Sequence, residues 1–240
     1  MNISSKITVG LIFAAFLNAE TVSDYAFDEF PSKSQWSSIA SPTVSDGQIV
    51  FDTSTDESVK NAKEPISLYE NCGITTKAQF DSEKLNFFKN KVEMVFSDLM
   101  VTGTGKPKNQ IFVFIITADK AGGESSSAFI RLRVSAEGEV LLQMRNFSVE
   151  TGSEVKDDVF FKAKVMLPIK RLALKMSKED FGISITGNDS LEQTIPWSSS
   201  FDISRWNNIP IFLSLKGVRT IGDEGHTVVT LGNFKIDSNP

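Results

Sequence analysis

The feature that most constrains the fold is the alternation of apolar and polar side chains across residues 126–146, SSAFIRLRVSAEGEVLLQMRN. Two alternating runs flank the turn Ala136-Glu137-Gly138, which is the sequence form of an antiparallel hairpin. Because successive strand residues point to opposite faces, one set should face a core and the other a basic surface. The predicted core set is Ile130, Leu132, Val134, Val140, Leu142 and Met144, and the outward set is Phe129, Arg131, Arg133, Leu141, Gln143 and Arg145.

Short apolar or alternating runs recur along the chain, separated by polar turns. We expect strands at 25–30, 48–52, 74–80, 91–101, 110–118, 159–167, 171–176, 181–186, 209–216 and 227–237, a short strand ending at Trp197, and one helical turn at 202–206. No long helix and no repeat of fixed period is visible in the sequence. The pattern predicts an all-β fold, specifically a two-sheet antiparallel jelly-roll sandwich.

The run at 111–118, IFVFIITA, is apolar on both parities. Such a strand is expected near the centre of a sheet, with one side in the core and the other under a loop or facing a groove. An apolar face left uncovered there would be a binding site.

The first nineteen residues have the layout of a secretory signal peptide, with Lys6, a short apolar run and Ala19 before Glu20. We therefore expect a signal peptide at 1–19 and one domain at 20–240, secreted or held in the cell envelope. No later run is long enough to span a membrane as a helix. Removal of 1–19 leaves 24 Lys and Arg against 30 Asp and Glu, a net charge of −6, which argues against nucleic acid as the partner.

Cys72 is the only cysteine, so no intramolecular disulfide can form, and we expect it to be buried. One Cys and one His cannot supply a structural zinc site. No cofactor is expected, although calcium bound by loop acids at Asp157-Asp158 or Asp223-Glu224 stays open. The sequons at Asn146 and Asn188 would accept glycans only in a eukaryotic host.

Four segments carry a resemblance to a known superfamily: YAFDEF, DGQIVF, FDISRWNNIPIFLSLKG and the terminal TVVTLGNFKID. With the secretory start, they resemble the secreted members of the concanavalin A-like lectin/glucanase superfamily over most of residues 24–237. The resemblance implies that the first and last strands lie side by side and that a concave sheet holds carbohydrate.

The catalytic motifs of that superfamily are missing from this sequence. The Glu-x-Asp-x-x-Glu run of its retaining glucanases does not occur, nor does the Gln-x-His of alginate lyases, since Gln143 is followed by Met144 and Arg145. A lyase would have to use His226 with Tyr25 or Tyr69 for proton transfer. That alternative predicts activity that collapses on His226→Ala or Tyr69→Phe.

The outward face of the hairpin is the candidate ligand site. Arg131, Arg133, Gln143 and Arg145 could bind the carboxylate or sulfate of an acidic sugar by bidentate hydrogen bonds, with Phe129 as a stacking neighbour. Lys162 and Lys164 would extend the basic surface if their strand joins the same sheet. The competing interpretation is a solvated surface whose arginines pair with acids on neighbouring strands.

The tryptophans divide in the same way. Trp206 is expected in the core, whereas Trp36 and Trp197 could be sugar platforms or loop anchors.

The sequence thus predicts a secreted, non-catalytic carbohydrate-binding β-sandwich whose partner is a polysaccharide or surface glycan. Two alternatives stay open: a polysaccharide lyase or glycoside hydrolase with an unrecognised motif, and a structural or adhesive module of an envelope.

Overall fold

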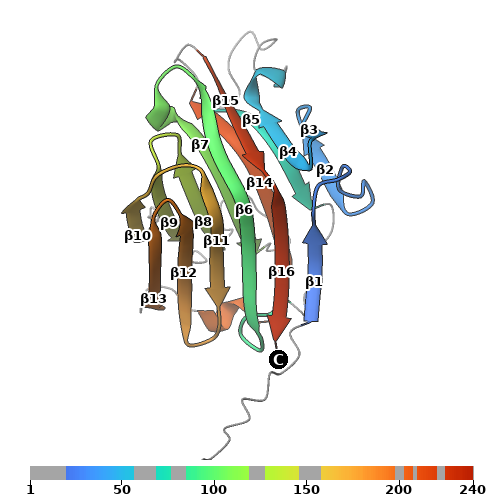
Figure 1. Ribbon diagram of the computed structural model, residues 1–240. Coiled ribbons are helices and arrows are strands. Elements are labelled where there is room, and N and C mark those ends of the chain that lie inside the picture. The colour runs from blue at the N-terminus through green and yellow to red at the C-terminus, as the bar shows by residue number, and fades with distance from the viewer. Residues whose placement is uncertain are drawn as a thin grey trace, which may run out of the picture.

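The computed structural model describes residues 20–56, 69–76, 85–118, 128–145, 158–197, 203–207, 210–220 and 225–239. These residues form two antiparallel sheets that pack face to face (Figure 1). The all-β jelly-roll prediction is therefore confirmed. No helix within the described part of the chain is long and apolar enough to cross a membrane. The predicted signal peptide at 1–19 lies outside the described residues.

One sheet has nine strands and the other has seven. The nine-stranded sheet consists of β1 (Glu20–Tyr25), β3 (Thr43–Ser45), β4 (Gln48–Asp52), β6 (Lys91–Thr104), β11 (Ile169–Met176), β12 (Asp180–Gly187), β13 (Ser190–Pro196), β15 (His226–Leu231) and β16 (Asn233–Asn239). The seven-stranded sheet has the order β10 (Asp158–Lys164), β9 (Glu139–Arg145), β8 (Ala128–Ser135), β7 (Gln110–Ala118), β14 (Ile211–Thr220), β5 (Tyr69–Thr76) and β2 (Trp36–Ile39). Three 3₁₀ turns complete the described structure: η1 (Thr53–Thr55), η2 (Pro107–Asn109) and η4 (Ile203–Trp206).

Aromatic side chains join the two sheets at the centre of the core. Phe96 on β6 lies 4.9 Å from Phe114 on β7, and Phe234 on β16 lies 5.7 Å from Phe114, measured between ring centroids. All three are fully buried. These are the distances at which aromatic pairs add stability beyond the area they bury.

The predicted hairpin is confirmed over the described residues 128–145 as β8 and β9, with Arg131 opposite Gln143 and Leu132 opposite Leu142. The residues predicted to face the core are all buried. Gly138 occupies the turn at φ +78°, and a Cβ there would meet the Val165 carbonyl oxygen at 1.9 Å. Only glycine fits this turn, because both the backbone angle and the close approach exclude a side chain.

The first strand was placed too late by the sequence. It is β1, which ends at Tyr25, whereas the prediction began there and ran to residue 30. Phe27 has φ +51°, which a strand does not allow, and its ring is buried and stacked on Tyr25 at 6.4 Å. β1 pairs with β16, with Tyr25 opposite Phe234, so the first and last strands do lie side by side.

The predicted last strand at 227–237 is two strands, separated at Gly232. Both pair with β6 in one continuous register, Thr230 opposite Met100 and Asn233 opposite Ser97. Between them, Asp98 of β6 has φ +51°, so the strand bends there. A Cβ on Gly232 would lie 3.2 Å from the Asp98 Cβ, so glycine accommodates the bend.

Other predicted strands differ at their ends. The strand expected at 74–80 begins at Tyr69 and ends at Thr76, residues 77–80 lie outside the described part, and the strand expected at 209–216 is β14, which continues to Thr220. The strand expected at 110–118 is confirmed as β7, fourth of the seven strands in its sheet.

Loss of an aromatic ring from the centre should weaken the sandwich as a whole. We expect Phe114→Ala to lower the free energy of unfolding by about 3–5 kcal/mol, the usual cost of emptying a buried phenylalanine site. Urea denaturation followed by tryptophan fluorescence measures it. Phe212→Ala is the matched control, since Phe212 is only half-buried on β14. Equal losses in the two variants would contradict a core centred on Phe114.

Candidate functional site: a basic, apolar-floored hollow

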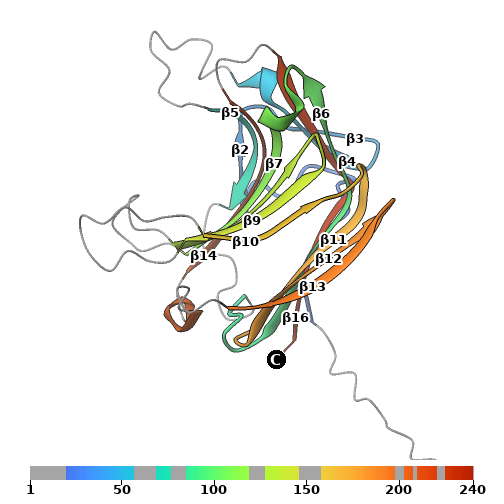
Figure 2. The ribbon, with the colours of Figure 1, turned by 90° about the vertical axis from the view of Figure 1, so that its left-hand side faces the viewer.

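The candidate site lies on the outer face of the seven-stranded sheet. Figure 2 shows β5, β7 and β14 bowed so that this sheet is hollow on the side away from the nine-stranded sheet. Alternate residues of β7 point outward there, opposite to the core set of Phe112, Phe114 and Ile116. Ile111, Val113 and Ile115 join Val218 of β14 in an apolar cluster separate from the main core. The second apolar face predicted for β7 is therefore confirmed, and it forms the apolar floor of the candidate site.

Cations stand around this floor because of the strand register. Val113 is paired with Arg133 on one side and with Lys216 on the other, and Ile115 is paired with Arg131. A hollow of about 240 Å³ results. Its lining is Tyr69, Asn71, Ile111, Val113, Ile115, Arg131, Arg133, Lys216 and Val218. None of these nine lining residues is a carboxylate.

Two of the cations have no acidic partner among the described residues. Within the described residues, the side chains of Arg133 and Lys216 make no hydrogen bond and no ion pair. Burial lowers the pKa of the Lys216 ammonium, and the nearby Arg131 guanidinium lowers it further. A half-buried cation beside other cations is costly to hold, and such sites are typical of surfaces that bind an anion.

The five residues predicted as ligand-binding share the outward face of the hairpin, but they do not act alike. Arg131 donates from Nε and Nη2 to the Gln143 Oε1, at 3.2 and 3.0 Å. The guanidinium carbons of Arg131 and Arg145 lie 4.9 and 4.7 Å from the centroid of the Phe129 ring. Phe129 thus contacts two guanidinium groups by cation–π interaction, and Gln143 fixes the plane of Arg131.

Only Arg131 and Arg133 of the five line the hollow. Phe129, Gln143 and Arg145 do not line it, and of these Gln143 and Phe129 hold Arg131 in place. The distinction matters chemically, because a guanidinium already held by an amide oxygen loses little conformational freedom when it binds an anion.

Lys216 is the lining cation that the sequence reasoning missed. Its signal was available in IFLSLKGV, where Ile211, Leu213 and Leu215 alternate with outward residues and Lys216 follows on the outward parity. What the sequence could not supply is that β14 lies next to β7, since the two strands are far apart in the chain.

The basic surface continues toward the sheet edge. β10 joins the same sheet, and Lys162 and Lys164 stand opposite Leu141 and Glu139. Lys162 pairs with Glu139 at 3.1 Å. A second hollow of about 220 Å³ lies here, lined by Lys108, Ile111, Arg133, Ser135, Glu139 and Leu141.

The strand ends next to the first hollow are joined by an ion pair between β5 and β14, on the side opposite to the hollow. Arg219 donates from Nε to the Glu70 Oε2 at 2.8 Å, and its Nη2 lies 2.6 Å from Oε1. Both side chains are largely buried, about a tenth exposed, so this bidentate pair fixes the strand ends beside Tyr69.

The outer face of the nine-stranded sheet is the contrasting case. Arg171 lies 2.6 Å from Glu93, Lys170 lies 2.8 Å from Asp98 and Lys235 lies 2.9 Å from Asp237. Arginines and lysines paired with acids on neighbouring strands are what the competing interpretation predicted for the hairpin. Arg171 and Lys170 have that arrangement on this sheet, whereas Lys235 and Asp237 both belong to β16.

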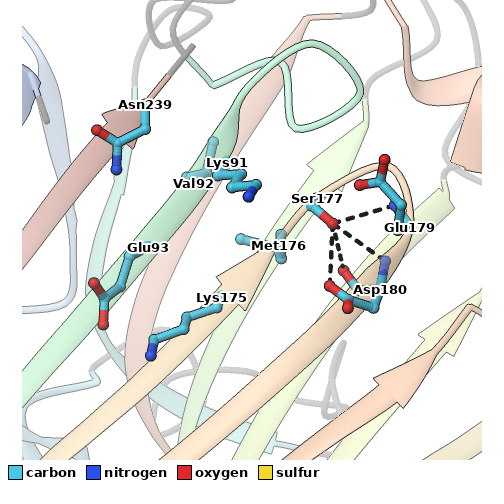
Figure 3. Close-up of a pocket in the computed structure, with 9 residues that line it drawn as sticks. All are labelled: Lys91, Val92, Glu93, Lys175, Met176, Ser177, Glu179, Asp180 and Asn239. Carbon is cyan, nitrogen blue, oxygen red and sulfur yellow. Dashed lines mark hydrogen bonds between the residues drawn. The ribbon is translucent and has the colours of Figure 1, made fainter. Parts of the chain in front are cut away.

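A larger hollow of about 530 Å³ lies at the end of the nine-stranded sheet, where β6 begins and β11 and β16 end (Figure 3). Its acids are already occupied: Glu93 pairs with Arg171, Glu179 lies 3.6 Å from the Lys178 Nζ, and Asp180 accepts a hydrogen bond from the Ser177 hydroxyl. This hollow is larger, but its lining mixes lysines with acids, whereas none of the nine residues that line the first hollow is acidic, so it is the weaker candidate for an anionic ligand.

The residues proposed for a lyase are divided between the two sheets. His226 lies on β15 of the nine-stranded sheet, with its Nδ1 3.1 Å from the Thr104 hydroxyl, so it is not part of the concave face. The Tyr25 hydroxyl lies next to Trp36 and Gln35, also away from the hollow. Only Tyr69, 46% exposed, lines the hollow.

The tryptophans serve as anchors. Trp36 is buried and donates from Nε1 to the Tyr25 hydroxyl at 3.0 Å, and Trp197 donates to the Ser177 carbonyl at 2.7 Å. Trp206 is in the core, as predicted.

Among the described residues no group of three or more His, Cys, Asp or Glu could hold a metal ion. Of the acids considered for calcium, Asp157, Asp223 and Glu224 lie outside the described part, and Asp158 is described only in its backbone. Cys72 is buried, as expected, and its burial raises the pKa of the thiol.

No protein-family model and no curated protein matches this sequence. Solved structures do match. The GH16 endo-β-1,3(4)-glucanase SCLam aligns with a TM-score of 0.60 and 11% identity over 92% of this chain and 92% of its own. The CBM2 module of the evolved Dit of Lactobacillus casei BL23 phage J-1 aligns at 0.55, with 9% identity over 92% and 97%. Lectin I of Ulex europaeus aligns at 0.52, with 10% identity over 92% and 98%.

At such identities the likeness shows the fold alone. It confirms the resemblance to the concanavalin A-like jelly-roll superfamily that the strand pattern indicated. The ligand has to be argued from the side chains of this chain, because the same fold carries hydrolases and binding proteins alike.

The lowered pKa of Lys216 gives a test of its role. Below its folded-state pKa, the buried Lys216 ammonium lowers the stability of the folded protein. This penalty disappears as pH rises from the folded-state pKa to the unfolded value of ~10.4, so stability should rise with pH in that window. We expect Lys216→Met to raise the free energy of unfolding at neutral pH and to lose this gain at high pH, in urea melts across pH.

The exposed Lys175, 3.9 Å from Glu192, supplies the control variant Lys175→Met, which should change stability by less than about 0.5 kcal/mol. If Lys216→Met instead destabilised the protein at neutral pH, Lys216 would have a structural role.

Proposed function

We propose that this protein is an exported, non-catalytic carbohydrate-binding β-sandwich that recognises acidic polysaccharide or surface glycan on its concave face. The observation that carries the proposal is the juxtaposition of Arg133 and Lys216, both without a described partner, across the apolar residue Val113. Export rests on the signal-peptide layout of residues 1–19.

An acidic sugar matches both the apolar floor of the hollow and the cations around it. The C–H face of a pyranose ring is apolar and can rest on Ile111, Val113 and Val218, while its carboxylate or sulfate can accept hydrogen bonds from the cations at the rim. A neutral sugar would leave Lys216 half-buried and uncompensated, so the site should discriminate by charge.

Similarity to carbohydrate-active and carbohydrate-binding structures supports the proposal at the level of the fold. The three aligned structures are a glucanase, a CBM2 module and a lectin. Because one structure of this fold is a glucanase, catalysis has to be tested directly. Hydrolysis by two carboxylates would need acids that the lining of the hollow does not offer.

Binding to purified polysaccharides tests the function. We expect the protein to bind polygalacturonate or a sulfated glycan, to ignore neutral β-glucan, and to bind more weakly as salt rises. Arg133→Ala and Lys216→Met should each weaken binding by roughly 10-fold or more, because a charge-assisted hydrogen bond contributes about 1.5–3 kcal/mol. Calorimetry or affinity electrophoresis measures the loss.

Arg171→Ala on the outer face of the other sheet is the matched control and should bind like wild type. The spent glycan is then assayed for new reducing ends and for the ultraviolet absorbance of an unsaturated uronate. Cleavage that stops in Tyr69→Phe would replace binding with lyase activity. Failure to bind any glycan would instead favour an envelope module without a sugar site.

A further inference from the structure

The two hollows on the concave face have two lining residues in common, Ile111 and Arg133. The first hollow extends from β5 across β14 and β7 to β8, and the second extends from β7 across β8 to β9. Arg133 therefore stands on the boundary between two adjacent concavities. A side chain in this position can contact a ligand in either hollow or in both.

The second hollow brings a cation of its own. Lys108 lies in η2, is exposed, and makes no hydrogen bond or ion pair with another described residue. The acid in that hollow, Glu139, is paired with Lys162 at 3.1 Å, so its charge is offset locally. The second hollow can thus hold an anion between Arg133 and Lys108.

The strand spacing lets the long side chains of Lys216 and Arg133 approach one anion from opposite sides of Val113. Lys216 and Arg133 lie on strands two steps apart, which is roughly 10 Å at the usual separation of neighbouring strands. Leu141, opposite Arg133 on β9, gives the second hollow an apolar surface comparable to Val113 in the first. Each hollow has the same two components, an apolar contact and a flanking cation.

We propose that the site binds the acidic groups of successive sugar residues, with one anion held between Lys216 and Arg133 and the next between Arg133 and Lys108. This rests on the proposed function, and it adds that the ligand is a chain with acidic groups on neighbouring residues rather than one acidic sugar. Arg133 is the specificity-determining residue, because it is common to both contacts.

Calorimetric titration with mono-, di-, tri- and tetragalacturonate tests the inference. We expect affinity to rise by about 10-fold or more from the monomer to the dimer or trimer, because the second contact becomes intramolecular. Lys108→Ala should weaken the longer oligomers by roughly two- to fivefold, the effect of an exposed charge pair, and leave the monomer unchanged. Arg133→Ala should weaken all lengths and remove the gain with length.

Lys106→Ala is the matched control, since Lys106 precedes the same turn but lines neither hollow. Methyl-esterified trigalacturonate should behave like a neutral sugar. If the monomer bound as tightly as the trimer and Lys108→Ala bound like wild type, the two-anion inference would be wrong while the proposed function stood. If no acidic oligomer bound at all, both would be wrong.

Discussion

The structure depends on one strand that is apolar on both sides. The inner face of β7 supplies Phe114, which meets Phe96 and Phe234 and so joins the two sheets. The outer face of the same strand supplies Ile111 and Val113, which remain in a separate apolar cluster on the concave surface. The residue pattern that closes the sandwich also lays the floor of the candidate site, because strand side chains alternate.

Charge then distinguishes the two outer faces of the sandwich. On the nine-stranded sheet, pairs such as Arg171 with Glu93 neutralise one another and leave a solvated surface. On the seven-stranded sheet, Arg131 is oriented by the Gln143 amide and by the Phe129 ring, and Lys216 is held beside it at a cost that burial imposes. Partly buried cations beside other cations have a physical explanation if a bound anion neutralises them.

The sequence patterns predicted the individual strands better than they predicted how distant strands pair. The alternation at 126–146 gave the hairpin and its two faces correctly, and the double apolar parity at 111–118 placed β7 near the centre of its sheet. The end of the first strand was wrong because the positive φ of Phe27 decides it, and the break at Gly232 was missed where Asp98 of β6 has a positive φ, since φ cannot be read from hydrophobicity. Lys216 was missed because its pairing with Val113 is a long-range contact that periodicity does not encode.

We propose that the concave face, and not the larger hollow at the end of the other sheet, binds the ligand. Titration of the isotopically labelled protein with trigalacturonate, followed by amide chemical shifts in NMR spectra, tests it most directly. We expect changes in amide chemical shift concentrated at Val113, Arg133 and Lys216, with the signals of Lys175 and Asp180 unchanged. Shifts confined to Lys175 and Asp180, or no shifts anywhere at saturating ligand, would contradict it.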